Sequence, residues 1–210
     1  MRKFALMLAL VLASACNSTD PFQYRVFTMG FPRTDGSLRG DDGYTYVFND
    51  LPEWNGAKRV VAVLDVVKAL GDSTLQAKLQ SFAVPLYKKP VVVEGEMPDS
   101  LGNEAIRLVD VWYAGGCLNM SNSIYVRADG TDKHGINLAF DQAGSSKDTV
   151  KFVLKHRYLS GKEEGAVLTE YGFYSSFPIS DLMPKADSTV IKVGWEWDGE
   201  AKGTSGKVRI

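Results

Sequence analysis

The chain has 210 residues, 45% of them hydrophobic and 23% charged, which is enough apolar material for one large hydrophobic core or two small ones. Lysine and arginine together number 24 and aspartate and glutamate 25, so the formal net charge is −1. Proteins that bind nucleic acids normally carry a basic excess or patch, and we therefore expect no nucleic-acid partner.

The first 15 residues have the layout of a secretory signal peptide. Arg2 and Lys3 form a positive n-region, and residues 4–13 form an apolar run too short for a spanning helix, which needs about 20 residues. Residues 13–15 are small and resemble the lipobox that precedes the lipidated cysteine of bacterial lipoproteins, here Cys16. The alternative is a plain secreted protein with an ordinary cysteine at this position.

This interpretation anchors the chain to a membrane. We expect residues 1–15 to be removed and Cys16 to carry fatty acyl chains such as palmitate, each buried CH₂ adding about 0.8 kcal/mol of membrane affinity. Residues 16–22 would be a tether. The expected location is the cell envelope, as an outer-membrane lipoprotein on either the periplasmic or the surface face.

Residues 23–97 predict a five-stranded barrel of the OB type. Short alternating runs separated by turn residues are typical of all-β proteins, and five strands is the count of an OB barrel. The turn signal at residues 41–43 (DDG) separates two of the runs. Leu75 and Leu79 would also suit one turn of helix. The expected strands cover residues 22–31, 44–49, 58–67, 74–82 and 89–96.

Residues 98–210 predict a two-layer β-sandwich. Along the last expected strand, Thr189, Ile191 and Val193 share one face, as in a sheet that is packed on one side and wet on the other. The polar, turn-rich segment 96–104 is where we expect the domain boundary. The expected sandwich strands cover residues 104–114, 123–129, 134–140, 148–158, 171–180 and 188–197.

The chain resembles the NigD-like lipoproteins of Gram-negative anaerobes. The residues that carry the resemblance are 41–43, 58–66, 101–120, 150–158 and 171–180, with the string WYAGGCLN at 112–119 the most specific. The resemblance implies an N-terminal OB domain followed by a C-terminal β-sandwich. It also implies an accessory or immunity role, because the family's namesake lies in a bacteriocin gene cluster. The family has no established catalytic residues to carry over.

No arrangement of residues predicts an enzyme, a metal site or a cofactor. His134 and His156 are separated in the sequence and have no metal-ligand spacing around them. His156 has the parity of the apolar residues before it, which predicts an inward or edge histidine with a hydrogen-bond partner. Cys117 is expected to be a buried small hydrophobe, because no second cysteine lies near it to form a redox pair. A redox role is the alternative.

Three pairs of acidic residues could in principle supply the two carboxylates that a glycosidase needs. The pairs are Asp41-Asp42, Glu94/Glu96 and Glu163-Glu164, each within or beside a turn. Solvated charge is the expectation for all three.

Aromatic side chains could form a surface for a sugar or a peptide. The alternation of Tyr44, Tyr46 and Phe48 predicts core or half-core positions, and Trp195 and Trp197 continue an apolar face. Tyr113, beside residues 115–116 (GG), is the residue that we expect to be partly exposed at a strand end, as a tentative binding surface.

The sequence therefore predicts an all-β, lipid-anchored, non-enzymatic accessory or binding protein. Its expected partners are the membrane, through the anchor at Cys16, and an envelope protein or a glycan or peptide ligand. The alternatives are a bacteriocin-cluster immunity factor, a glycan-binding protein or an acid-dependent hydrolase.

Overall fold

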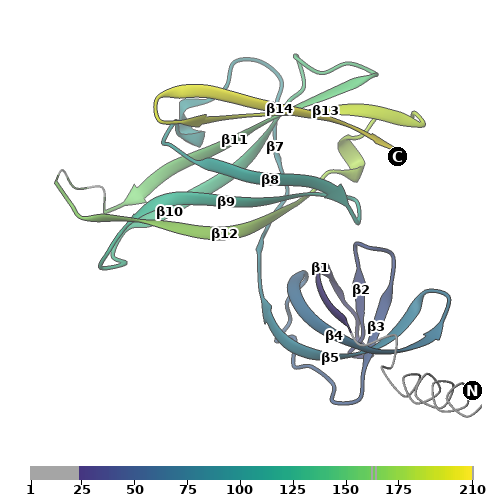
Figure 1. Cartoon of the computed structure of the whole chain (residues 1–210). Helices are drawn as coiled ribbons and strands as arrows, with labels where there is room; N and C mark the ends of the chain where they lie inside the picture. The colour runs from purple at the N-terminus through teal and green to yellow at the C-terminus, as the bar shows by residue number, and fades with distance from the viewer. Residues whose placement is uncertain (1–23, 162, 164, 210) are drawn as a thin grey trace, which may run out of the picture.

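The computed structural model describes residues 24–161, 163 and 165–209 and is almost entirely β-structure. The expected signal peptide, Cys16 and the expected tether lie outside the described residues. Within this part of the chain, no helix combines the length and apolar character needed to cross a bilayer. Figure 1 shows a small barrel at the bottom and a larger two-sheet body above it, joined by one connection.

The N-terminal domain is a closed barrel with the strand order β1-β2-β3-β5-β4, which is the OB topology. β1 pairs antiparallel with β2 and with β4, and β3 pairs parallel with β5 to close the barrel. Its strands are β1 (Tyr24–Pro32), β2 (Leu38–Gly40), β3 (Thr45–Phe48), β4 (Val60–Gly71) and β5 (Thr74–Ala83). The expected five-stranded barrel is confirmed.

The barrel core follows from the alternation along β4. Val60, Ala62 and Leu64 are buried at 0% exposure and pack with Tyr46 and Phe48 of β3. Strand alternation sends such residues to one face, here the interior of the barrel. The expected core positions of Tyr46 and Phe48 are confirmed, whereas Tyr44 is 39% exposed.

The C-terminal domain is a sandwich of two sheets, with the orders β14-β13-β11-β10-β7 and β6-β12-β9-β8. Its strands are β6 (Leu86–Tyr87), β7 (Val91–Val93), β8 (Arg107–Ala114), β9 (Cys117–Arg127), β10 (Lys133–Asp141), β11 (Thr149–Ser160), β12 (Leu168–Pro178), β13 (Ser188–Trp197) and β14 (Glu200–Arg209). Two short 3-10 helices, η1 (Asp99–Leu101) and η2 (Ser180–Leu182), lie in connections.

The sandwich core comes from both sheets. Val150, Phe152 and Leu154 of β11 are 1% exposed, and they pack with Leu118 and Met120 of β9 in one buried cluster. The alternation in the sequence therefore identifies the inward face of each of these strands.

The expected layout is wrong in three respects, and the first is that β14 is not among the expected strands. The segment 89–96 is not a barrel strand, because β7 pairs in parallel with β10 of the sandwich. The short β2 is the barrel strand that takes its place. The boundary expected after residue 97 also falls earlier, since β6 already pairs with β12. Local alternation predicts a strand but not the sheet that receives it.

Candidate functional site

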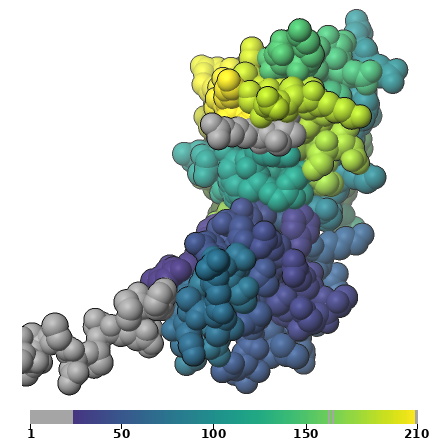
Figure 2. Space-filling model, turned by 90° about the vertical axis from the view of Figure 1, so that its right-hand side faces the viewer, coloured from purple at the N-terminus to yellow at the C-terminus, as the bar shows by residue number. Residues whose placement is uncertain are grey.

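A buried ion pair lies where the barrel meets the sandwich. Arg59 Nη2 donates to Asp41 Oδ2 at 2.5 Å and to Asn119 Oδ1 at 2.9 Å, and Arg59 Nε donates to Ser176 Oγ at 2.6 Å. The side chain of Arg59 is 0% exposed and that of Asp41 is 8% exposed. We call these four residues the junction cluster. Two come from each domain, so the cluster holds the domains in one arrangement, and Figure 2 shows the two bodies in direct contact.

The polar groups of the junction cluster also bind one another. Ser176 Oγ donates to Asn119 Oδ1 at 2.6 Å, and Asn119 Nδ2 donates to Asp41 Oδ2 at 3.3 Å. The guanidinium carbon of Arg59 lies 4.3 Å from the centre of the Phe31 ring, which is a favourable cation–π distance. A buried charge needs such partners, because burial removes it from water.

The barrel positions its half of the cluster through the DDG turn. Asp41 directly follows β2, and Arg59 directly precedes β4. The next residue, Asp42, accepts hydrogen bonds from the backbone N–H of Tyr44 at 3.1 Å and from the hydroxyl of Tyr46 at 2.6 Å. These bonds fix the turn and direct Asp41 toward the sandwich.

The sandwich contributes the tight β8–β9 turn at Gly115 and Gly116, which have φ of +60° and +74°. A Cβ on Gly115 would lie 2.5 Å from Asp41 Oδ1 and 3.0 Å from the ring of Phe31. Glycine is therefore required at 115 for two reasons, the left-handed backbone and the contact with the barrel.

Burial sets the electrostatics of this region. It raises the pKa of the Asp41 carboxyl, and the hydrogen bond and charge of Arg59 act in the opposite direction. The expectation that Asp41 is a solvated turn charge is wrong. Cys117 is a free, buried thiol beside the cluster, and burial raises its pKa. Its burial is as expected, and a thiol held in the protonated form is a poor nucleophile.

A hollow of about 510 Å³ lies beside the junction cluster and between the domains. Its aromatic lining includes Trp112 of β8 and the rings of Phe27 and Tyr174, whose centroids are 5.7 Å apart. Asp110 also lines it, with Oδ1 accepting the backbone N–H of Val111. The hollow thus offers carboxylate acceptors and aromatic faces, a chemistry that suits a polyhydroxylated or cationic ligand.

Tyr113 does not line this hollow, unlike its sequence neighbour Trp112. It is half-buried and packs against the sandwich core, whereas Trp112 faces the barrel. The partial exposure of Tyr113 is as expected, and its role as a binding surface stays a prediction. Trp195 packs on the sandwich core, and Trp197 stacks on Tyr125 with centroids 5.3 Å apart.

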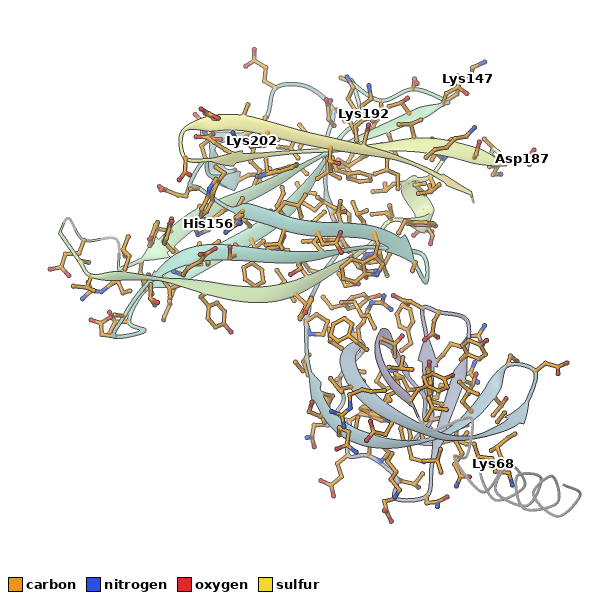
Figure 3. The ribbon with its side chains drawn as sticks, viewed as in Figure 1. Lys68, Lys147, His156, Asp187, Lys192 and Lys202 are labelled. Carbon is orange, nitrogen blue, oxygen red and sulfur yellow. The ribbon has the colours of Figure 1, made fainter. Side chains whose placement is uncertain are left out.

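The two histidines, although separated in the sequence, meet inside the sandwich. His134 Nδ1 and His156 Nε2 are 2.8 Å apart, and His156 Nδ1 donates to the carbonyl of Ala105 at 2.8 Å. The antiparallel pairing of β10 with β11 produces this contact. Figure 3 shows His156 between the sheets. The inward position of His156 is confirmed. Over the described residues, no group of three or more histidine, cysteine or acidic side chains could hold a metal ion.

The other acidic pairs lie away from the junction. Glu94 and Glu96 are exposed, as expected. Glu163 pairs with Arg127 at the surface, and Glu164 lies outside the described residues.

Sequence reasoning missed Arg59, Asn119 and Ser176 as partners. The separations in sequence are 60 residues from Arg59 to Asn119 and 117 from Arg59 to Ser176. The family resemblance offered one signal for this site. Three of the segments that carry it meet here: the DDG turn, the start of β4 and the WYAGGCLN string.

Comparison with known proteins gives a family and several structural relatives. The model of the NigD-like C-terminal beta sandwich domain matches residues 89–205. No curated protein matches the chain.

Three solved structures resemble nearly the whole chain. A protein of unknown function from Bacteroides vulgatus has a TM-score of 0.69 at 16% identity, covering 89% of this chain and 92% of its own. A NigD-like immunity protein from Bacteroides caccae has a TM-score of 0.59 at 17% identity, covering 91% and 99%. A candidate lipoprotein from Bacteroides fragilis has a TM-score of 0.64 at 10% identity, covering 89% and 97%. At these identities the likeness shows a shared two-domain fold.

Proposed function

This chain belongs to the NigD-like family, and on that premise we propose that it is a lipid-anchored accessory protein of the bacterial cell envelope that acts by binding. The signal-peptide layout of residues 1–15 and the lipobox before Cys16 support the anchor. A structural relative described as a candidate lipoprotein is in keeping with an envelope location.

The observation that carries the proposal is the junction cluster. Arg59 and Asp41 are buried against Asn119 and Ser176, so the chain presents one fixed two-domain surface. A fixed surface binds a partner without the entropy cost of ordering two mobile domains. Most polar groups at the centre of the junction bind one another, which makes their first role structural, while Asp41 Oδ1 and Arg59 Nη1 are buried without a hydrogen-bond partner among the described residues.

Capture of a partner tests the binding role. The full-length protein is crosslinked in native membranes and purified, and the crosslinked species are identified by mass spectrometry. We expect one envelope protein in stoichiometric amount. Recovery of none, together with no binding in glycan and peptide screens, would contradict the proposal.

The anchor is tested at the cysteine itself. Cys16→Ala is expected to move the protein from the membrane fraction to the soluble envelope fraction, because the acyl chains are lost. Ser18→Ala is the matched control and should stay with the membrane. Membrane partition of Cys16→Ala, or an unmodified N-terminus by mass spectrometry of the native protein, would refute lipidation.

An immunity-type role is the second candidate, supported by the family and by the relative described as a NigD-like immunity protein. Deletion of the gene should then increase the sensitivity of the producer to its own bacteriocin, and restoring the gene should reverse this. Unchanged sensitivity after deletion would remove this candidate and leave the binding role in place.

A further inference from the structure

On one side of the sandwich, the edge strands β12 and β10 are paired with a further strand over only part of their length. The connection from the barrel supplies β6, which pairs in parallel with β12 at Ser175 and Ser176, and β7, which pairs with β10 at residues 139–141. Beyond these short strands, residues 168–174 of β12 and 133–138 of β10 have no further strand beside them among the described residues. In Figure 1 the left half of β12 extends well past the connection.

The two bare edges differ in their protection. Lys88 Nζ donates to the carbonyl of Ile136 at 3.0 Å and to Asn137 Oδ1 at 2.7 Å, so a lysine occupies the β10 edge. Lysine on an edge is a common protection against strand pairing. Among the described residues, no lysine binds the outer backbone groups of residues 168–174 in this way. The alternate backbone N–H and C=O groups of β12 that point away from β9 therefore face outward there.

Between these edges lies a cavity of about 700 Å³ that opens beside the β12 edge. Its walls are apolar and come from Ile124 and Val126 of β9, Tyr171 and Phe173 of β12, and Val84 of the connection. Tyr171 is 56% exposed and Val84 61% exposed, so the mouth presents apolar surface to solvent. An exposed apolar surface around a cavity is typical of a binding site.

The cavity has one polar end. His134 and Asp132 line it, with His134 Nε2 lying 2.9 Å from Asp132 Oδ2. The imidazole and the carboxylate at this end can form hydrogen bonds with a polar group of an occupant whose apolar part fills the rest of the cavity.

We propose that residues 168–174 of β12 accept an extended peptide segment of a partner protein as an added strand, with alternate apolar side chains of that segment entering the cavity. The chain itself already adds a strand to this edge, since β6 pairs with residues 175–176. The proposed strand continues that pairing along the same edge. Backbone pairing supplies affinity in this mode, and the cavity supplies selectivity for apolar side chains.

An extended peptide fits the site better than the other occupants. A small apolar molecule would fill the cavity but leave the β12 backbone groups unpaired. A second copy would present its own β12, whose Tyr171 and Phe173 already line its own cavity, and both cavities would remain unfilled. The inference rests on the proposed binding role and names the chemistry of the partner.

Synthetic peptides test the pairing directly. Ten-residue peptides of alternating valine and threonine, flanked by lysines, are titrated onto the full-length protein and followed by amide hydrogen exchange. We expect slower exchange at residues 168–174. Methylating alternate backbone nitrogens keeps the side chains but removes the hydrogen bonds of one edge, and should weaken binding about tenfold or more.

Matched variants locate the site. Tyr171→Lys places a charge at the mouth of the cavity and should abolish peptide protection. Val109→Lys is the control, since Val109 is 60% exposed on β8 at the opposite edge of the same sheet, and it should bind peptide normally. Both changes are at exposed positions, and an unchanged unfolding midpoint verifies the fold.

Each alternative outcome overturns the inference. Equal binding of the N-methylated peptide would mean capture of apolar groups without strand pairing. Protection of residues 168–174 by self-association in the absence of peptide would assign the edge to a second copy. Absence of binding by every peptide would remove the site, whereas recovery of a crosslinked envelope protein in that case would leave the proposed function standing.

Discussion

At the scale of single residues, Arg59 determines how the two domains are joined. A guanidinium at 0% exposure is costly unless its partners are in place, and here a carboxylate, an amide and a hydroxyl bind it while Phe31 stacks on it. Three of these five residues precede the connection between the domains, and Asn119 and Ser176 follow it. The stability of the junction therefore depends on groups that only the complete fold brings together.

Replacing Arg59 should be strongly destabilising. Arg59→Met leaves the Asp41 carboxylate buried without its cation, at a cost of about 3–5 kcal/mol in the free energy of unfolding. The measurement is equilibrium denaturation in urea. The double variant Arg59→Met/Asp41→Asn removes both charges and should lose less than Arg59→Met alone. Equal losses, or a loss below about 1 kcal/mol for the single variant, would show that the ion pair is not central to the junction.

Gly115 tests the same junction from the sandwich side. Gly115→Ala should cost more than Gly130→Ala, although both glycines have a left-handed backbone, with φ of +60° and +66°. The reason is space, since a Cβ at 130 meets nothing within 4 Å and one at 115 meets Asp41. The backbone alone accounts for about 1–2 kcal/mol in each. Thermal or urea denaturation that gives equal losses would argue against close contact at this turn.

At the scale of strands, the sequence was most informative where alternation was long. β4 and β11 were predicted because buried residues recur at every second position over many residues. β2 was missed because Leu38–Gly40 is too short to alternate, and β14 was missed because its strand carries almost no large apolar side chains. The segment around β7 was predicted as a strand but assigned to the wrong domain, because pairing partners are not encoded locally.

The histidine pair shows a second limit of sequence reasoning. The parity of His156 placed it inward, but its contact with His134 depends on the register of β10 against β11. The junction cluster has the same origin, as its residues are far apart in sequence and each one alone resembles an ordinary turn or strand residue.

His156 should stabilise the link between this hairpin and the segment that leads into β8. His156→Leu removes the donor to the carbonyl of Ala105 and the partner of His134, at an expected cost of about 1–3 kcal/mol. His156→Asn keeps a donor close to the position of Nδ1 and should recover part of the loss. Urea denaturation checks both variants, and a leucine variant as stable as the unaltered protein would contradict the role assigned to these bonds.

At the scale of the whole molecule, the barrel and the sandwich have separate hydrophobic cores and a polar junction between them. Separate cores would allow separate unfolding, and the buried ion pair couples them together with the ring contacts Phe27–Tyr174 and Phe31–Tyr87. The solved relatives cover this same two-domain span, so the arrangement is a property of the fold and not of one terminal segment. A surface that crosses both domains is then available to a partner in one shape.

Differential scanning calorimetry of the full-length protein tests this coupling most directly. We expect a single transition in which the calorimetric and van't Hoff enthalpies agree, because the domains unfold together. Arg59→Met should split it into two transitions. Two separate transitions in the unaltered protein would contradict the conclusion that the junction makes the two domains one unit.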